Sequence, residues 1–383
     1  MTGADPTAAG GAATPAAKRD RVRRLPGRHR TVVRAGSALA VLAALCGCVE
    51  PVHMERDWTA LDRPASAEVW ATTERVAVRL LDSFPAAMER VAESQSIARS
   101  DSELNRVNAE AQTGYYRVED HDLFRAIALA LDYGKASDGD YDPTLGPVLR
   151  LYAQYGSEPP DETTLADALA SVAWDAVVLE RGIFALHFLR PGMQIDLDGM
   201  IEGYAIDVAA RKFVLTGSLA GLLRLGPQVY AWGRPPDRAE WWVDVWDPRS
   251  SEPRPLLRVR IDKSRGIAVS GSGGASDLVI DPATGKPASS DVVVAVAFAD
   301  SVADAVAVSR ALLVGGTSRA GVLLSERTRR VESVLFPRDE EASAALASAS
   351  LQGRVELVDD PAAEGPRALR FLLPPSELQG RLD

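Results

Sequence analysis

The chain has 383 residues, of which 46% are hydrophobic and 25% are charged, and its formal net charge is −10 at pH 7. Such an acidic protein is poorly suited to bind nucleic acid, because contacts with phosphate groups dominate that affinity. Its only cysteines, Cys46 and Cys48, lie near the N-terminus, so the rest of the chain can form neither a disulfide framework nor a zinc-thiolate cluster.

The first 47 residues have the features of a lipoprotein signal peptide. Residues 18–34 contain eight Lys and Arg residues, and an apolar run follows over residues 35–45. This run is too short for a membrane-spanning helix and is typical of a signal-peptide core. The sequence Leu-Cys-Gly-Cys that ends at Cys48 resembles a lipobox. The alternative is an ordinary signal peptide, or a buried segment with two chance cysteines.

Cleavage before Cys48 would give an exported lipoprotein, anchored to a bacterial membrane through a lipid on this cysteine and facing the periplasm or the cell exterior. The mature chain of 336 residues would carry a net charge of −16, from 35 basic and 51 acidic residues. A negatively charged body has little attraction to an anionic membrane surface, so a lipid anchor suits it.

The N-terminal half is predicted to be mainly helical. Residues 48–66 contain prolines and lack periodicity, which indicates a tether. Apolar residues recur at helical spacing over residues 67–98, which predicts a long amphipathic helix or a strand followed by a helix. Helices are also predicted over residues 121–135 and 165–173, with a turn at 138–143 between them.

The C-terminal half is predicted to mix strands and helices, which favours the α+β fold class, with mixed or antiparallel sheets packed with helices. The folded domain is expected to span residues 67–336, and 337–383 to form a peripheral C-terminal extension. Strands are predicted over residues 177–179, 183–188, 222–225, 241–246, 256–261, 292–298 and 331–336. Helices are predicted over residues 199–215, 301–314 and 320–326.

Generic catalytic signals are scarce. None of the four histidines lies beside a nucleophile, and neither a P-loop nor a dinucleotide-binding glycine motif is present. The glycine-rich residues 271–274 could bring backbone N–H groups close to a phosphate, although a tight turn explains them equally well.

Five segments in a fixed order carry more information. They are DSELNRVN (101–108), DGDYDPTLGP (138–147), IDLDGMIEGYAID (195–207), AVSG (268–271) with IDPATGKP (280–287), and VADAVA (302–307). This set resembles the ApbE-type FAD:protein FMN transferase family over residues 67–336.

The resemblance implies an activity. Proteins of this family hold FAD with Mg²⁺ near its diphosphate, cleave the diphosphate and attach FMN to a threonine or serine hydroxyl of an acceptor protein. A hard cation with oxygen ligands suits this chemistry, because it offsets the charge of the diphosphate. The expected partner is an acceptor flavoprotein subunit of a membrane or exported redox system.

The resemblance also implies site residues. Asp304 and Glu202 are the expected catalytic residues, and the metal ligands would be Asp304, the main-chain carbonyl of Ile201 and Ser309. The expected cofactor-binding residues are Glu103, Asn108, Asp142, Thr144, Gly199, Tyr204, Asp207, Ser270, Gly271, Asp281, Thr284 and Gly285.

Simpler interpretations stay open for several of these positions. Asp304 could be a first-turn acid of a helix that begins at Ser301. Asp207 could be a solvated helix acid, and residues 281–285 could be only a turn. The matching residues of the N-terminal segments could shape the cleft without touching flavin.

The sequence also departs from the family pattern within these motifs. Glu202 stands where the family has Lys, Asp198 where it has Gly, and Val308 where it has a metal-binding Thr. Further departures are Gly226-Pro-Gln228 for a Gly-Gly-Asp turn, Val269 for Thr and Leu278 for His. The alternative function is therefore a catalytically impaired flavin-binding or partner-binding lipoprotein on the same fold, which gains support if Glu202 and Val308 face the metal cleft.

Overall fold

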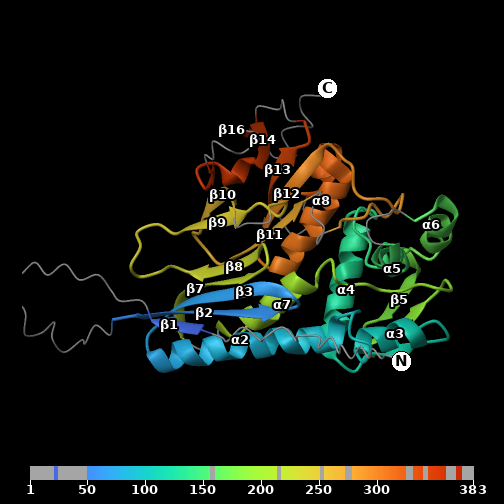
Figure 1. Ribbon diagram of the computed structural model, residues 1–383, viewed down its shortest axis with the longest axis horizontal. Helices are drawn as coiled ribbons and strands as arrows, with labels where there is room; N and C mark the ends of the chain where they lie inside the picture. Colours follow the sequence, from blue (N-terminus) through green and yellow to red (C-terminus); the bar gives the residue numbers. More distant parts are fainter. Residues whose placement is uncertain are drawn as a thin grey trace, which may run out of the picture.

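In the computed structural model, a ten-stranded sheet is the central element of the fold (Figure 1). The structure describes residues 21–24, 50–155, 160–213, 217–250, 254–271, 278–324, 331–339, 344–358 and 368–372. In spatial order the strands are β1 (Arg21–Arg24), β2 (Val52–Ala60), β3 (Arg63–Ala71), β7 (Ser218–Leu225), β8 (Gln228–Gly233), β11 (Arg265–Gly271), β12 (Val292–Ala299), β13 (Glu332–Pro337), β14 (Ala344–Ser348) and β16 (Ala368–Leu372). Neighbours are antiparallel except β14 and β16, which are parallel.

Two three-stranded sheets and a set of helices complete the fold, which confirms the predicted α+β class. One sheet has the order β15 (Val355–Leu357), β10 (Pro255–Arg260), β9 (Trp242–Trp246), and the other β4 (Tyr116–Arg117), β6 (Ala185–Phe188), β5 (Val177–Glu180). The helices are α2 (Glu74–Gln95), α3 (Glu103–Glu110), α4 (His121–Ala136), α5 (Gly146–Tyr155), α6 (Glu162–Leu169), α7 (Ile201–Ala210) and α8 (Val302–Leu323), with short 3₁₀ turns at Trp174–Ala176 and Ala349–Leu351.

The main sheet is covered on both faces, and the pattern of β12 shows how. Successive strand residues point to opposite faces. Val294, Val296 and Phe298 enter a core shared with β9 and β10. The alternate residues Ala295 and Ala297 belong to the larger core that contains the helices. Small side chains on this face let α8 lie close against β11 and β12.

Several predicted elements are confirmed. Residues 67–98 form a strand followed by a helix, β3 and α2, and the predicted hairpin is β5 with β6. The helix predicted over residues 301–314 is α8, which runs further than expected and breaks at Gly316 (φ 65°, ψ −164°). At this break Asp291 accepts a hydrogen bond from the N–H of Thr317 at 2.9 Å, so the last turns of the helix begin anew.

The predicted tether over residues 48–66 is wrong for most of its length. Residues 52–60 form β2, which pairs with β3 along its whole length across a turn at Leu61 and Asp62, both with positive φ. Met54 and Trp58 are buried. Because charged residues separate the two, the sequence does not show the clear apolar and polar alternation that is expected of a strand with one buried face.

The C-terminal residues are likewise less peripheral than predicted. Strands β14 and β16 extend the main sheet, while β15 pairs with β10. Ala345, Ala347 and Val355 are buried in the core shared with β9 and β10. The short apolar stretches of this segment become strands because an existing sheet edge offers them backbone partners.

The predicted signal peptide and its Cys48 lie outside the described residues, apart from β1, which pairs with β2. Among the helices of the described segments, none has the length and apolar character needed to cross a lipid bilayer.

Candidate active site

Three of the five motif segments meet at one cleft. They are the loop before α5, the segment before α7 and the turn around residue 280, and α8 closes the cleft with Arg310 and Val314. The cleft is narrow: its volume is about 40 Å³, well below the roughly 300–1,000 Å³ of small-molecule sites. It is lined by Asp140, Tyr141, Asp142, Leu145, Leu149, Asp196, Gly199, Leu278, Val279, Ile280, Pro282, Arg310 and Val314.

Backbone contacts hold the motif segments together. Leu145 and Gln194 form an isolated parallel bridge, and the N–H of Asp196 donates to the carbonyl of Pro143 at 2.8 Å. The segment before α7 is thus fixed to the loop before α5, which explains why two motifs about fifty residues apart in the sequence (138–147 and 195–207) form one wall.

Asp142 and Thr144 form a buried hydrogen-bond network. Asp142 accepts from the N–H of Thr144 at 2.7 Å, from its hydroxyl at 2.6 Å and from the N–H of Trp174 at 3.1 Å. The hydroxyl of Thr144 also accepts from the N–H of Ala173 at 2.8 Å. Burial raises the pKa of the Asp142 carboxyl above its usual value. Asp142 lines the cleft, whereas Thr144 is fully buried behind it and shapes the loop.

Arg310 and two carboxyl groups face one another in the cleft. Asp196 accepts from the N–H of Asp198 at 2.8 Å. Burial, with a smaller contribution from Asp198, raises the pKa of Asp196 to about 7, and burial also raises the pKa of Asp198. Arg310 opposes both shifts, and its guanidinium lies over Gly199, where an added Cβ would be 3.5 Å from Nε.

Arg310 is a cleft residue that the motifs did not predict. A signal was present, because Arg310 is the only cation within residues 302–314, a run that is otherwise almost entirely apolar. Arg310 is half-buried, and a charged side chain is seldom withdrawn from solvent without a partner.

The predicted residues of the first motif brace the structure from behind the cleft. Glu103 accepts from the N–H groups of Glu119 at 2.5 Å and Asp120 at 2.9 Å, where α4 begins. Asn108 bonds both the N–H and the carbonyl of Ile195 at 2.8 Å. Neither residue lines the cleft, so their role is to hold the segment before α7 and the start of α4.

Asp207 and Tyr204 contribute to packing and not to the cleft. Asp207 accepts from the N–H groups of Val302 at 2.8 Å and Ala303 at 2.9 Å, so it caps α8 from α7 and is not a solvated acid. Burial raises its pKa to about 7. Tyr204 is buried against α4, where its hydroxyl lies 3.5 Å from Asp122.

The predicted metal ligands are only partly suited to their role. Asp304 is buried in the first turn of α8, where Ser301 accepts a hydrogen bond from its N–H. The hydroxyl of Ser309 donates to the carbonyl of Val306 at 3.0 Å and lies 2.8 Å from the hydroxyl of Ser270, so it faces β11 and is already bonded. Val308 is buried in the core.

A magnesium site would therefore depend on Asp304 and the carbonyl of Ile201. The described residues contain no group of three or more His, Cys, Asp or Glu side chains that could hold a metal ion. Mg²⁺ often binds through one or two carboxylates together with the phosphates of its substrate. This donor set fits an ion that binds together with a nucleotide.

Glu202 is engaged by a cation from another strand. Its carboxylate lies 3.0 Å from Nε of Arg63, the first residue of β3, and the two side chains are 16% and 24% exposed. Gly226 of the turn between β7 and β8 lies beside the pair. The charge reversal at position 202 is therefore compensated within the fold. The expected metal ligands Asp304 and Ile201 do not line the cleft, and neither do Glu202 and Val308.

The remaining predicted cofactor residues form close turns. Ser270 bonds Ser309, and a Cβ on Gly271 would lie 2.7 Å from Pro248, which accounts for glycine there; the rest of the glycine-rich segment lies outside the described residues. Asp281 accepts from the N–H of Ala283 at 2.9 Å and from the hydroxyl of Thr284 at 2.9 Å. Gly285 (φ 66°) ends this turn against α6. The turn presents its neighbours Ile280 and Pro282 to the cleft.

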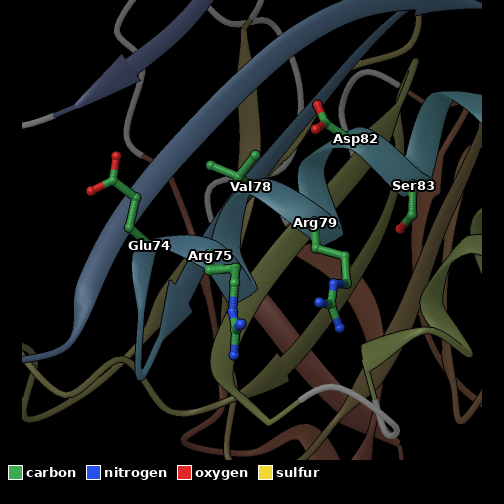
Figure 2. A pocket seen from close by; sticks show the side chains of 6 residues that line it. All are labelled: Glu74, Arg75, Val78, Arg79, Asp82 and Ser83. Atoms are coloured by element: carbon green, nitrogen blue, oxygen red, sulfur yellow. The ribbon is translucent and has the colours of Figure 1, made fainter.

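A larger surface depression, of about 800 Å³, lies elsewhere and involves none of the motif residues (Figure 2). All its lining side chains come from the first half of α2, and they carry charges of both signs. It is open to solvent along one helix and lacks the convergent walls of a small-molecule site.

Comparison with known proteins agrees with the motif pattern. The sequence model of the ApbE family matches residues 62–335 of this chain. A Treponema pallidum protein named FAD:protein FMN transferase is 29% identical over 288 residues, which cover 69% of this chain and 78% of that protein. A Vibrio cholerae protein of the same name is 24% identical over 338 residues, which cover 82% of this chain and 97% of that protein.

Solved structures share the fold. The apo form of the Pseudomonas stutzeri flavinyl transferase ApbE matches with a TM-score of 0.67 and 18% identity, covering 79% of this chain and 97% of that one. The Thermotoga maritima ApbE protein matches with a TM-score of 0.64 and 21% identity, covering 80% and 97%.

Proposed function

Since the chain belongs to the ApbE family, we propose that it is an FAD:protein FMN transferase. The hydroxyl oxygen of an acceptor threonine or serine forms a bond to the FMN phosphorus of FAD. The bond from that phosphorus to the bridging oxygen breaks, AMP leaves, and the hydroxyl releases its proton. The convergence of three motif segments on one cleft supports this function best.

The residues around the cleft have distinct parts in this proposal. The apolar side chains of Leu145, Leu149, Ile280, Pro282 and Val314, called here the apolar wall, offer a surface for a flat ring of the donor. The Asp142 network holds the loop before α5, which carries part of this surface, and Asn108 holds the segment before α7, which forms another wall of the cleft. A preorganised site of this kind lowers the entropic cost of orienting the donor.

Magnesium dependence is part of the proposal. Asp304 and the carbonyl of Ile201 would hold Mg²⁺ together with oxygens of the bound diphosphate. The ion would supply positive charge that stabilises the leaving phosphate. Glu202, which is paired with Arg63, has no part in this step; its charge is offset by the guanidinium and so repels the diphosphate less than an unpaired carboxylate.

The proposed setting is a membrane surface. The lipobox-like sequence at Cys48 supports export and lipid attachment, and a flavoprotein subunit of a membrane or exported redox system would be the acceptor. Covalent attachment prevents loss of flavin by diffusion outside the cell. Fatty-acid labelling of wild type and of Cys48→Ser would test the anchor, and equal labelling of both would refute it.

An in-vitro transfer assay tests the activity. The purified chain is mixed with FAD, Mg²⁺ and a candidate acceptor flavoprotein subunit, and the acceptor is analysed by intact mass for one added FMN and by in-gel flavin fluorescence. We expect transfer that stops when the metal is chelated. Asp304→Asn should abolish transfer at equal folded content, whereas the remote exposed change Asp132→Asn should leave it unchanged.

The alternative function predicts a different result. Retention of FAD in equilibrium dialysis without transfer to any acceptor would favour a flavin-binding lipoprotein with an impaired site. Failure to retain FAD at millimolar Mg²⁺ would remove the transferase and the flavin-binding alternative, and would leave the partner-binding one.

A further inference from the structure

Arg310 occupies an unusual position for a charged side chain. It projects from α8 into the narrow cleft and is only partly exposed. Within the part of the chain that the structure describes, its guanidinium has neither a hydrogen bond nor a salt bridge. A guanidinium presents five N–H donors in a fixed plane, so this group has a large unused capacity to bind an anion.

The neighbouring carboxyl groups do not use this capacity. Asp196 and Asp198 are close enough for Arg310 to lower their pKa values, yet burial prevails and both pKa values stay raised. Neither carboxyl lies within 4.0 Å of the guanidinium, the distance that defines a salt bridge. The cation is attracted towards this side of the cleft without being bound there.

The guanidinium lies near both the residues proposed for the diphosphate and its metal ion and those proposed for the flat ring of the donor. On one side it lies over Gly199, with Cζ at 3.6 Å from the position of an added Cβ. Gly199 precedes Ile201 by two residues, so the Cα atom of the residue whose carbonyl would bind the metal is within roughly 7 Å along the backbone. On the other side is the apolar wall. Among the described residues that line the cleft, Arg310 is the only cation.

We propose that Arg310 binds a phosphate group of the dinucleotide donor, at the point where the diphosphate leaves the apolar wall and approaches Asp304. The planar fork of arginine matches the oxygens of a phosphate and can bind two of them at once. This assignment rests on the proposed function. It gives the site a fixed positive charge at a place where the polypeptide otherwise contributes acids.

Ligand binding with and without phosphate tests the assignment. Isothermal titration calorimetry would measure how tightly the full chain, with Mg²⁺ present, binds FAD, ADP and riboflavin. Arg310→Met keeps an unbranched apolar stem but removes the charge, and Arg310→Lys keeps the charge but removes the fork. We expect Arg310→Met to weaken FAD and ADP about tenfold or more, Arg310→Lys to weaken them less, and riboflavin to be unaffected.

Two controls separate phosphate binding from other roles of the arginine. Arg181→Met removes an exposed arginine that pairs with Asp132 and should leave every affinity unchanged. Asp198→Asn combined with Arg310→Met tests whether the arginine only neutralises its neighbour. Recovery of FAD affinity in this double variant, or a parallel loss of riboflavin affinity, would overturn the assignment.

The outcomes also distinguish this inference from the proposed function. If wild type transfers FMN and Arg310→Met leaves the KM for FAD unchanged, the arginine assignment fails and the transferase stands. If wild type transfers no FMN but binds ADP in an Arg310-dependent way, the phosphate site stands and the transferase fails.

Discussion

The ion pair between Arg63 and Glu202 explains how the fold tolerates an acid at position 202, where the family motif has lysine, and its strength can be measured. The guanidinium Nε and the carboxylate oxygen are 3.0 Å apart, and the side chains are 24% and 16% exposed. At this distance the gross attraction is about 5 kcal/mol for an effective dielectric constant near 20. Desolvation and partial exposure offset most of it, which leaves a net coupling of about 1–2 kcal/mol.

A double-mutant cycle isolates this coupling. The free energy of unfolding in urea, followed by tryptophan fluorescence, is measured for wild type, Arg63→Met, Glu202→Gln and the double variant. The exposed pair Arg181–Asp132, at 2.7 Å with 57% and 52% exposure, is the matched control, and its coupling should stay below about 0.5 kcal/mol.

The same pair predicts the effect of restoring the family residue. Glu202→Lys places two cations together and should destabilise the chain by more than Glu202→Gln does, while Arg63→Glu with Glu202→Lys should recover most of the loss. A coupling no larger than that of the control pair, or a Glu202→Lys variant as stable as wild type, would refute the reasoning that the reversal is compensated by Arg63.

Three further changes test the support of the cleft. Asn108→Ala leaves the N–H and carbonyl of buried Ile195 without their partner and should lower the free energy of unfolding by about 2–4 kcal/mol in urea titrations; a loss below about 0.5 kcal/mol would contradict the bracing role. Gly203→Ala puts a Cβ 2.9 Å from Val306 and 3.0 Å from Ala303, so it should cost about 1–3 kcal/mol by overpacking α7 against α8, whereas Gly182→Ala, with nothing within 4 Å, should show no steric cost. Asp196→Asn removes a carboxyl whose pKa is raised to about 7. Between about pH 4 and pH 7 the folded chain keeps a proton that the unfolded chain releases, so wild type should lose stability relative to the variant as the pH rises from about 4 to about 7. An equal difference in free energy of unfolding between the two proteins at pH 4.5 and 7.5 would show that the carboxyl is ionised throughout.

Much of the fold followed from periodicity alone. The continuous apolar run of β12 and the helical spacing of α4 identified these elements, because β12 is buried on both faces and α4 on one. Strand β11 was missed: its sequence, RGIAVSG, is short and contains two glycines. It is a strand because β8 and β12 flank it on both sides, which is a tertiary cause. Strand β2 was missed because its exposed face is highly charged.

The sequence predicts which segments lie around the cleft better than it predicts which side chains of those segments line it. Segments of three motifs line the cleft, with Asp142 and Gly199 among the predicted residues that do so; their predicted role in cofactor binding stays a prediction. The sequence leaves the structural roles of Glu103 and Asn108 as one of two interpretations, because it does not show which backbone groups a polar side chain contacts. The importance of Arg310 depends on the crossing of α7 and α8, which brings it over Gly199.

That crossing has a consequence for ion selectivity. Asp207 ties the last turns of α7 to the first N–H groups of α8, and Gly203 admits the backbone of α8 at close range. These contacts hold the two helices together near Ile201 and Asp304, which limits how far the main chains at these two residues can move apart. If the proposed ion binds between these residues, a site that resists widening would favour the ion with the shorter bonds to oxygen, about 2.0–2.1 Å for Mg²⁺, over Ca²⁺ at about 2.3–2.6 Å. Discrimination between the two ions would then reside in the packing of the helices as much as in the ligands themselves.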